Sequence, residues 1–492
     1  MCGIVGYIGE KPAKNTIVEC ISNLEYRGYD SAGIAICSSD KTLRVAKGVG
    51  TINKVLNRFK SYSLNGTVGI GHTRWATHGK VTDDNAHPHT DCTLKIAIVH
   101  NGTINNYMEL KWGLIHKGHF FTSETDSEVI AHLIEEEMKT APFEVAFKSA
   151  IKRLSGNMAI LAVCSDEPDT LIAYKVGSPL VIGSVRESNE FILASDAISF
   201  AKLTNYVTFL EDGDIVVIRD NGKKIDRTNV SGKSNSLEFV EIEWDENFWD
   251  KGKYAHYMLA EIMNQPLTLA NSLEKHTDNI DDIKKVATLI KNAKHVIFVA
   301  CGTSRYASII GRYLFSTVGK VMSEVIMASE FKYFCNSIDE NTLIIAVSQS
   351  GETADVTMSI NSAKAHGAKV ISIVNVPGSS LERKSDYVFY LFCGPEVSVA
   401  ATKTYTSELV VLYLISAALA DKTKIMTQKL MHLPVRIEDS IYDNIQKISV
   451  VTCELEKSEH IYYLARGINF ATAGEAALKM KEISYIHAEG MP

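Results

Sequence analysis

The 492-residue sequence predicts two kinds of fold, one after the other along the chain. Up to about residue 240, short apolar, β-branched runs separated by turn residues indicate an α+β domain rich in strands. From about residue 283, apolar strands alternate with helical patterns, which is typical of an α/β doubly wound parallel sheet. The length itself is too great for one hydrophobic core and indicates about three domains.

Within the first domain, strands are expected at residues 2–8, 33–37, 95–99 and 158–163. Helices are expected at residues 16–24 and 125–139, where apolar residues recur about every 3.6 positions. The second helix opens with Ser123-Glu124-Thr125-Asp126, residues that favour a helix N-terminus. The polar segment 221–236 then predicts the exit from this domain and the start of a linker.

The second half begins with a helix expected at residues 254–273, followed by strands at 295–300, 343–347, 370–374 and 387–392. The run from His295 to Gly302 lines up with the run from His460 to Gly467, which indicates an internal repeat. The second copy is expected to be incomplete, because one strand and one helix do not bury both faces of a sheet. The predicted domains are residues 1–240, a linker with a helix at 241–285, a sheet domain at 286–425, and a truncated copy at 426–492.

Composition excludes several classes of protein. A net charge of −7 argues against nonspecific nucleic-acid binding. No apolar run reaches the ~18 residues that span a bilayer, and the start lacks signal-peptide features, so we expect a cytoplasmic protein without a membrane partner. The nine cysteines are scattered and contain no CxxC pair, which predicts a reducing compartment without a disulfide framework or a zinc site.

Cys2, directly after Met1, is the most specific chemical signal. Methionine is normally trimmed before a small side chain, so Cys2 is expected to supply both a thiol nucleophile and an α-amine of pKa near ~8. Asn101-Gly102 is expected at the end of a strand, where an amide and a backbone N–H suit an oxyanion. The guanidinium of Arg74 can donate two hydrogen bonds to a carboxylate, and Asp126 can bind an ammonium group. Taken singly, each has an ordinary explanation as a small core residue, a turn, a surface ion pair or a helix cap.

Together these segments resemble the class II glutamine amidotransferases with an N-terminal nucleophile. The resemblance rests on residues 1–4, 27–33, 71–79, 100–102 and 123–126. It implies a four-layer αββα fold in which Cys2 attacks the glutamine amide while Asn101 and Gly102 stabilise the oxyanion. It further implies a residue that gates the passage of ammonia and a set that binds L-glutamine, namely Trp75 for the gate and Arg74, Thr77, His78 and Asp126 for glutamine.

Two strand-to-helix turns in the second half indicate a phosphate site. Residues 301–304 and 348–353 place hydroxyl and N–H groups at expected helix N-termini, although ordinary N-caps are the alternative. Neither turn is a dinucleotide or ATP loop, and no cofactor is expected. Glu475, Lys479 and Glu482 fall on one face of a helical stretch at 473–485, as proton transfer between C1 and C2 of a sugar requires. A solvated charged stripe is the alternative.

These segments resemble the sugar isomerase (SIS) domains of the glutamine–fructose-6-phosphate aminotransferase family. The matching stretches are 300–304, 348–353, 395–403 and 474–489, with Ala401 standing where many relatives have serine. The resemblance implies that Glu482 is the isomerising base, with Lys479 beside it. It places the sugar phosphate against Thr303, Ser304, Ser348, Gln349, Ser350 and Thr353.

The implied function is the conversion of fructose 6-phosphate to glucosamine 6-phosphate, the first step of hexosamine synthesis. Glutamine is the donor, and ammonia is channelled from Cys2 to the sugar site of an expected homodimer. Three alternatives stay open. A glutaminase-only chain is one, because the family's ring-opening histidine and Schiff-base lysine lie beyond residue 492. A non-catalytic sugar-phosphate-binding regulator is another, although the Cys2 constellation counts against it. A class II enzyme with a phosphoribosyl acceptor would need an acidic run that we do not find.

Overall fold

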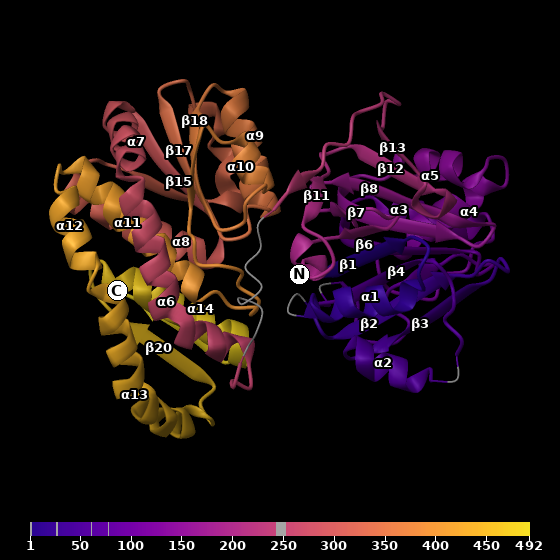
Figure 1. Cartoon of the computed structure of the whole chain (residues 1–492), viewed down its shortest axis with the longest axis horizontal. Coiled ribbons are helices and arrows are strands. Elements are labelled where there is room, and N and C mark those ends of the chain that lie inside the picture. Colours follow the sequence, from indigo (N-terminus) through magenta and orange to yellow (C-terminus); the bar gives the residue numbers. More distant parts are fainter. Residues whose placement is uncertain (1, 26–27, 61, 77, 243–251) are drawn as a thin grey trace. The chain divides into compact units, whose positions relative to one another are not determined.

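The chain forms two compact units in its computed structural model, residues 1–244 and 245–492 (Figure 1). The structure describes residues 2–25, 28–60, 62–76, 78–242 and 252–492. No helix among these residues is long and apolar enough to cross a membrane.

The first unit is built on two stacked sheets in which every neighbouring pair of strands is antiparallel. The eight-stranded sheet has the order β14 (Val240–Glu241), β11 (Tyr206–Phe209), β9 (Val181–Ser184), β10 (Phe191–Ala194), β1 (Gly3–Ile8), β4 (Val68–Arg74), β2 (Ser31–Cys37) and β3 (Leu43–Val49). The six-stranded sheet has the order β13 (Lys224–Asn229), β12 (Asp214–Arg219), β8 (Glu167–Val176), β7 (Gly156–Cys164), β6 (Ile96–Ile104) and β5 (His89–Thr90).

Helices cover the outer face of each sheet and complete four layers. Helices α1 (Ala13–Ser22) and α2 (Ile52–Arg58) pack on the eight-stranded sheet. Helices α3 (Tyr107–His116), α4 (Glu128–Met138) and α5 (Phe143–Ile151) pack on the six-stranded sheet. The αββα architecture expected of the first domain is therefore confirmed.

Strand β1 shows why the layers form where they do. Ile4 and Ile8 point into the core between the two sheets, whereas Val5 and Tyr7 point into the core beneath α1. Successive side chains of a strand alternate between faces, so an uninterrupted apolar strand has to be covered on both sides. Cys2 comes directly before this fully buried strand.

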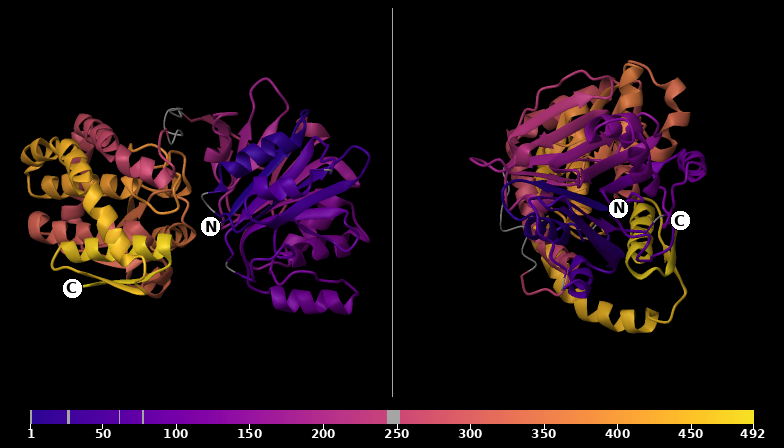
Figure 2. Two further views of the ribbon diagram at one scale, coloured as in Figure 1. Left: turned by 90° about the horizontal axis from the view of Figure 1, so that it is seen from below. Right: turned by 90° about the vertical axis from the view of Figure 1, so that its right-hand side faces the viewer.

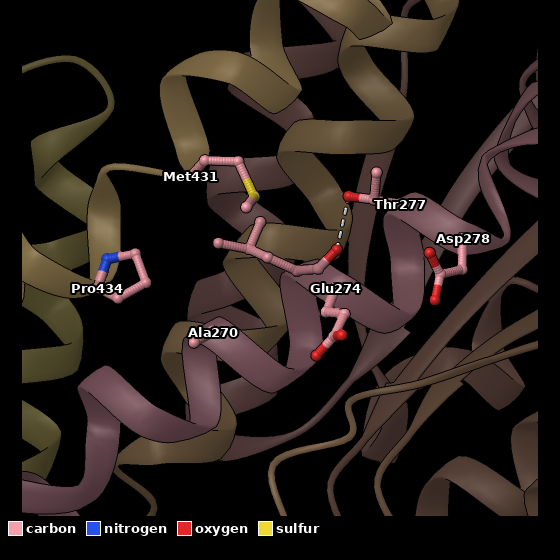
Figure 3. A pocket seen from close by; sticks show the side chains of 7 residues that line it. Ala270, Glu274, Thr277, Asp278, Met431 and Pro434 are labelled. Carbon is pink, nitrogen blue, oxygen red and sulfur yellow. Dashed lines mark hydrogen bonds between the residues drawn. The ribbon is translucent and has the colours of Figure 1, made fainter.

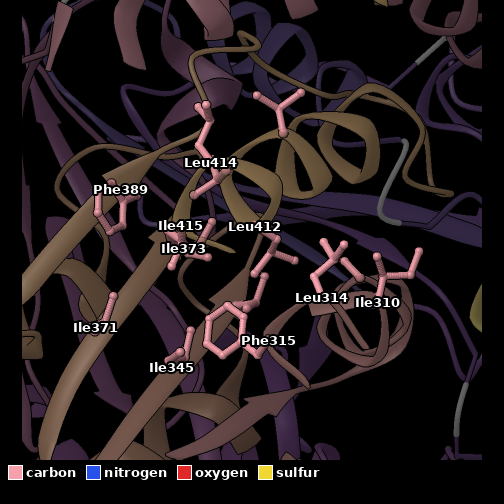
Figure 4. Packing of buried hydrophobic residues seen from close by; sticks show 14 of the residues in the cluster. Ile310, Leu314, Phe315, Ile345, Ile371, Ile373, Phe389, Leu412, Leu414 and Ile415 are labelled. Carbon is pink, nitrogen blue, oxygen red and sulfur yellow. The ribbon is translucent and has the colours of Figure 1, made fainter. Parts of the chain in front are cut away.

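The second unit is built on a five-stranded parallel sheet, as expected. Its order is β16 (Glu324–Met327), β15 (His295–Ala300), β17 (Thr342–Ser348), β18 (Lys369–Val374) and β19 (Tyr387–Tyr390). One face packs on α6 (Tyr257–Asp278), α7 (Ile280–Asn292), α8 (Gly302–Leu314) and α11 (Lys403–Leu419), and Figure 4 shows apolar side chains of this core. The other face packs on α9 (Ala354–Ala365) and α10 (Ser380–Lys384).

The predicted repeat appears as a second strand–helix pair. Strand β20 (His460–Leu464) leads into α14 (Asn469–Ser484), as β15 leads into α8. Strand β20 pairs in parallel with β21 (His487–Met491), and α14 contacts both strands (Figure 2). Helices α12 (Thr423–Leu430) and α13 (Leu433–Leu455) connect the two copies along the chain.

The structure adds to the sequence predictions of local structure in three places. Residues 224–229, expected in the exit from the domain, form the edge strand β13, and polar residues are common on such edges. The helix expected in the linker is α6, and its Leu269 and Leu273 are buried in the core of the second unit. The edge strand β16 was not expected, because four residues are too few to show a period.

Buried Glu408 gives the second unit a predicted pH dependence. Its carboxylate accepts a hydrogen bond from Ser304 Oγ at 2.7 Å, and burial raises its pKa from 4.5 to about 8. Because the folded state binds this proton more tightly than the unfolded state, the proton stabilises the fold fully below pH 4.5. That stability is lost progressively up to about pH 8, at about 1.4 kcal/mol for each pH unit.

We therefore expect the urea midpoint of the second unit to fall between pH 5.5 and pH 8, and to fall less in Glu408→Gln. Pulse proteolysis, with the fragments identified by mass, measures this midpoint for each unit separately. Glu340→Gln removes an exposed carboxylate from the same unit and is the matched control. An unchanged pH dependence in Glu408→Gln contradicts the prediction.

Candidate functional sites

The Cys2 thiol lies against the backbone of Trp75. The Trp75 N–H donates to Cys2 Sγ at 3.4 Å, and Sγ lies 3.5 Å from the Trp75 carbonyl oxygen. This contact follows from the sheet register, because β1 pairs with β4 and Gly3 stands opposite Thr73. Burial raises the pKa of the thiol, whereas the Trp75 N–H and the positive charge of Arg74 lower it. The thiolate therefore has stabilising groups around it that oppose the effect of burial.

Asn101 and Gly102 lie beside Cys2, but inside a strand rather than at its end. Strand β6 continues to Ile104 because it pairs with β7 along its whole length. The Asn101 side-chain amide donates to the Cys2 carbonyl at 3.0 Å. Gly102 is exposed and has a φ of +131°, and a Cβ there would lie 1.9 Å from the Asn157 carbonyl oxygen. Only glycine fits this position.

A buried histidine orients the Asn101 amide. His72 Nε2 lies 3.1 Å from Asn101 Oδ1 and 3.2 Å from the carbonyl oxygen of His100. Burial lowers the pKa of His72 to about 3, so its ring is neutral. With the hydrogen on Nε2, the ring donates to the amide oxygen and leaves the amide nitrogen of Asn101 directed at Cys2.

Arg74 and Asp126 are buried close to the thiol. The Arg74 guanidinium donates to the carbonyl oxygens of His78, Gly79 and Lys80, and so holds the loop that follows β4. The negative charges of Cys2, Asp30 and Asp126 raise the pKa of Arg74 against the effect of burial. Arg74 therefore lies within electrostatic reach of both Cys2 and Asp126.

The helix that was expected to begin near Asp126 begins at Glu128. Asp126 accepts a hydrogen bond from the Ile104 N–H at 2.8 Å, which ties it to the end of β6. Glu128 accepts hydrogen bonds from the N–H groups of Thr122 and Ser123. Its side chain therefore provides the acceptors for these backbone groups before α4. Asp126 is thus tied to the end of β6, and the alternative that it is an ordinary helix cap is not supported by its hydrogen bond.

The loop after β4 carries the other residues predicted for this site. Trp75 is half-buried, and its ring meets the edge of Tyr29 with centroids 5.6 Å apart. His78 is exposed, and its ring lies 5.2 Å from that of Tyr107. Thr77 lies outside the residues that the structure describes.

A second cluster of polar side chains joins α8 to α14. Thr303 Oγ1 donates to Glu475 Oε1 at 2.9 Å. Lys479 Nζ donates to Thr303 Oγ1 at 2.9 Å and to Glu482 Oε2 at 2.6 Å. The three charged residues of α14 therefore share one face, and that face meets the first turn of α8.

Glu475 is buried in this cluster, which the sequence alone did not indicate. It is 5% exposed, and burial raises the pKa of its carboxyl to about 7 in spite of the nearby ammonium of Lys479. A carboxyl that titrates near neutral pH is suited to proton transfer. The spacing of four residues to Lys479 was visible in the sequence, but the burial was not.

The turn before α9 is tightly folded. Ser348 Oγ lies 3.1 Å from Thr353 Oγ1 and accepts from the Gly351 N–H at 3.2 Å. The Glu352 N–H donates to Ser350 Oγ, and the Gln349 carbonyl accepts from the Asn375 N–H. Gly351 has a φ of +64°, and a Cβ there would lie 2.2 Å from Ser379 Oγ.

Strands β15 and β17 are parallel neighbours, so the turns that follow them lie at the same edge of the sheet. The first of these turns carries Thr303 and Ser304, and the second runs from Ser348 to Thr353. Ser304 is buried, with its hydroxyl donating to Glu408. The hydroxyl of Thr303 instead faces the α14 cluster.

A cavity of about 340 Å³ lies elsewhere in the second unit, between α6 and the start of α13 (Figure 3). It contains none of the residues predicted for a site. Its lining is Ala270, Leu273, Glu274, Thr277, Asp278, Met431 and Pro434.

Comparisons with known proteins match a part of each unit. Residues 58–217 match the glutamine amidotransferase domain, and residues 289–418 match the SIS domain. The chain resembles the C-terminal domain of glucosamine-fructose-6-phosphate aminotransferase from Francisella tularensis, with 35% identity and a TM-score of 0.45 over 49% of this chain and 71% of that one.

Two curated relatives match over nearly the whole chain. The glutamine–fructose-6-phosphate aminotransferase [isomerizing] of Pyrococcus horikoshii is 43% identical over 497 residues, which cover 100% of this chain and 82% of the relative. The enzyme of that name from Thermotoga maritima is 43% identical over 501 residues, which cover 99% and 81%. The chain therefore belongs to the glutamine–fructose-6-phosphate aminotransferase family.

Proposed function

We propose that this protein uses L-glutamine to aminate and isomerise fructose 6-phosphate, giving glucosamine 6-phosphate and glutamate. The observation that carries the proposal is the presence, in one chain of this family, of two separate chemical centres. One is Cys2, whose carbonyl oxygen accepts from the oriented Asn101 amide and whose thiol lies against the Trp75 backbone. The other is the hydrogen-bonded cluster of Thr303, Glu475, Lys479 and Glu482.

At the first centre, the Cys2 thiol attacks the side-chain carbonyl carbon of glutamine, and the α-amine of Cys2 accepts the thiol proton. The Asn101 amide, already directed at Cys2, and the Gly102 N–H stabilise the oxyanion. Collapse of this intermediate releases ammonia and leaves a thioester, which water hydrolyses to glutamate.

Binding of glutamine is assigned to charges near the thiol. Arg74, with Thr77 and His78, holds the α-carboxylate, and Asp126 holds the α-ammonium. The support for this assignment is electrostatic, because the negative charges of Cys2 and Asp126 both raise the pKa of Arg74. A zwitterionic substrate is matched by one cation and one anion held close together.

At the second centre, the sugar phosphate binds to Thr303, Ser304, Ser348, Gln349, Ser350 and Thr353. Two helix N-termini at one sheet edge supply N–H groups for an anion. Glu482 moves the proton between C1 and C2 of the sugar. Lys479 Nζ donates a hydrogen bond to Glu482 Oε2 at 2.6 Å. Glu475, whose pKa is about 7, is able to exchange a proton at the same cluster.

The two half-reactions should separate by mutation. We expect Cys2→Ala to lower glutamate release by about 10³-fold or more, because the nucleophile is lost, while added ammonium salt still supports aminosugar formation. Glu482→Gln should keep glutamate release and lower glucosamine 6-phosphate formation by about 10²-fold or more. Mass spectrometry of both products provides the measurement.

The control for these variants is Cys453→Ser, which changes an exposed thiol of α13 and should leave both products unchanged. Glutamate release that survives in Cys2→Ala contradicts the assignment of the nucleophile. Equal losses of both products in Glu482→Gln contradict the assignment of the base.

Trp75 is proposed to gate the passage of ammonia. Its backbone contacts the thiol, while its ring is half-buried against Tyr29. We expect Trp75→Ala to release glutamate with less than a matching amount of aminosugar, because ammonia escapes to solvent. Trp75→Phe should keep more of the coupling, and the measured quantity is the ratio of the two products. A ratio unchanged in Trp75→Ala rules out the gate.

We also propose a cytoplasmic homodimer. The cytoplasmic location is supported by all nine cysteines being unpaired, and fractionation of cells tests it.

The dimer is supported by α13, which has no buried residue and carries exposed apolar side chains, including Tyr442, Ile445 and Ile448. Such a surface favours association with another protein surface. Light scattering should give twice the chain mass, and a monomer at micromolar concentration rejects the dimer.

A further inference from the structure

Four potential metal ligands converge at one place in the first unit, away from the thiol site. Ligand atoms of Cys92, His119, His132 and Glu135 all lie within 4.8 Å of one another. Cys92 lies in the segment between β5 and β6, and His119 lies between α3 and α4. His132 and Glu135 are three residues apart on α4, so their side chains share one face of that helix.

Four of the distances between these ligand atoms run from 2.9 to 3.8 Å, around those of a tetrahedral centre. Cys92 Sγ lies 3.8 Å from His119 Nδ1 and 3.5 Å from His132 Nδ1. Glu135 Oε2 lies 2.9 Å from His119 Nδ1 and 3.1 Å from His132 Nδ1. Zinc bonds of about 2.3 Å to sulfur and about 2.0 Å to nitrogen or oxygen put tetrahedral ligands about 3.3–3.6 Å apart.

The outer nitrogens of both rings face carboxylates. His119 Nε2 lies 3.1 Å from Glu136 Oε2, and His132 Nε2 lies 3.6 Å from Glu128 Oε1. A neutral imidazole with its hydrogen directed at such a carboxylate has a lone pair on Nδ1. Carboxylates in this outer position are the usual partners of zinc-binding histidines.

This arrangement leaves electron pairs facing each other. When Nε2 carries the hydrogen, the Nδ1 lone pair of His119 meets a Glu135 oxygen at 2.9 Å. The same oxygen meets Nδ1 of His132, so two nitrogen atoms and one carboxylate oxygen crowd together beside a sulfur atom. A cation placed between the four atoms would be coordinated by these electron pairs.

We propose that Cys92, His119, His132 and Glu135 bind one zinc ion. The thiolate and the carboxylate balance its two charges, and the thiolate with two imidazoles favours zinc over magnesium or calcium. Four protein ligands leave no open position, which is the pattern of structural rather than catalytic zinc. No zinc site is evident in the sequence, because these ligands form no CxxC pair and come from three separate segments.

The zinc ion would fasten segments that carry the thiol site. The segment that bears Cys92 leads into β6, which carries Asn101 and Gly102. The segment that precedes α4 carries Asp126, and Glu128 joins that segment to the outer face of His132. Zinc in this position ties both segments to α4 without touching a substrate.

Metal binding is tested on the full chain by competition with a chromophoric chelator. We expect one zinc ion per chain in the wild type and in Cys453→Ser, and affinity at least about tenfold weaker in Cys92→Ser and in Glu135→Gln. Saturating zinc should raise the Tm of the first unit in the wild type but not in Cys92→Ser. Circular dichroism shows whether each variant is folded before it is titrated.

Cobalt substitution identifies the ligands. The wild type and Cys2→Ala should show thiolate-to-cobalt charge-transfer absorption, and Cys92→Ser should lose it. Loss of this band in Cys2→Ala with retention in Cys92→Ser would overturn the proposal, because the metal would then belong to the N-terminal thiol. Failure of the folded wild type to bind stoichiometric zinc overturns it as well.

Discussion

The pairing of β1 with β4 is the constraint on which the rest of the first unit depends. β1 is buried on both faces, and its register places Gly3 opposite Thr73. The residue before β1 therefore meets the residues that follow β4, and Cys2 Sγ comes within hydrogen-bonding distance of the Trp75 N–H. A shift of one position in this register would move every apolar side chain of β1 to the opposite core. The packing of the two sheets therefore fixes the register, and the register fixes the position of the thiol.

In the second unit, burial changes the pKa values of two carboxyl groups. Glu475 and Glu408 are both almost fully buried, and in each case burial raises the pKa of the carboxyl, to about 7 and about 8 respectively. Each accepts a hydrogen bond from a hydroxyl in the first turn of α8, from Thr303 and Ser304 in turn. Two adjacent residues of one turn are thus joined to two carboxyls on different helices, of which only Glu475 is also close to Lys479.

Much of the fold could be predicted from the sequence, because its strands are apolar and its helices are periodic. The strand at 295–300 has the predicted limits, and the parallel sheet follows from the alternation of strands and helices. The edge strands β13 and β16 could not be predicted, because pairing with a neighbour, rather than a pattern of their own, makes them strands. The start of α4 was misplaced because Ser123 and Asp126 make their hydrogen bonds to Glu128 and Ile104 instead of capping the helix.

Candidate site residues were found in the sequence where motifs are local, and were missed where the fold assembles them. Cys2 and Asn101-Gly102 stand out as short signatures, whereas His72 has no signature and acts only through its contact with Asn101. The cluster of Cys92, His119, His132 and Glu135 has only the three-residue spacing on α4 as a local signal. Its other two members arrive from separate segments, and no spacing rule connects them.

Two glycines show what the motif at residues 27–33 contributes physically. A Cβ on Gly28 would lie 2.5 Å from the Trp75 nitrogen, the same nitrogen that donates to Cys2. A Cβ on Gly33 would lie 2.3 Å from the His87 carbonyl oxygen, so neither position has room for a larger residue. The motif leaves space for the backbone after β4 to come close enough for the Trp75 N–H to reach the thiol, and this requirement explains why small residues stand at these positions.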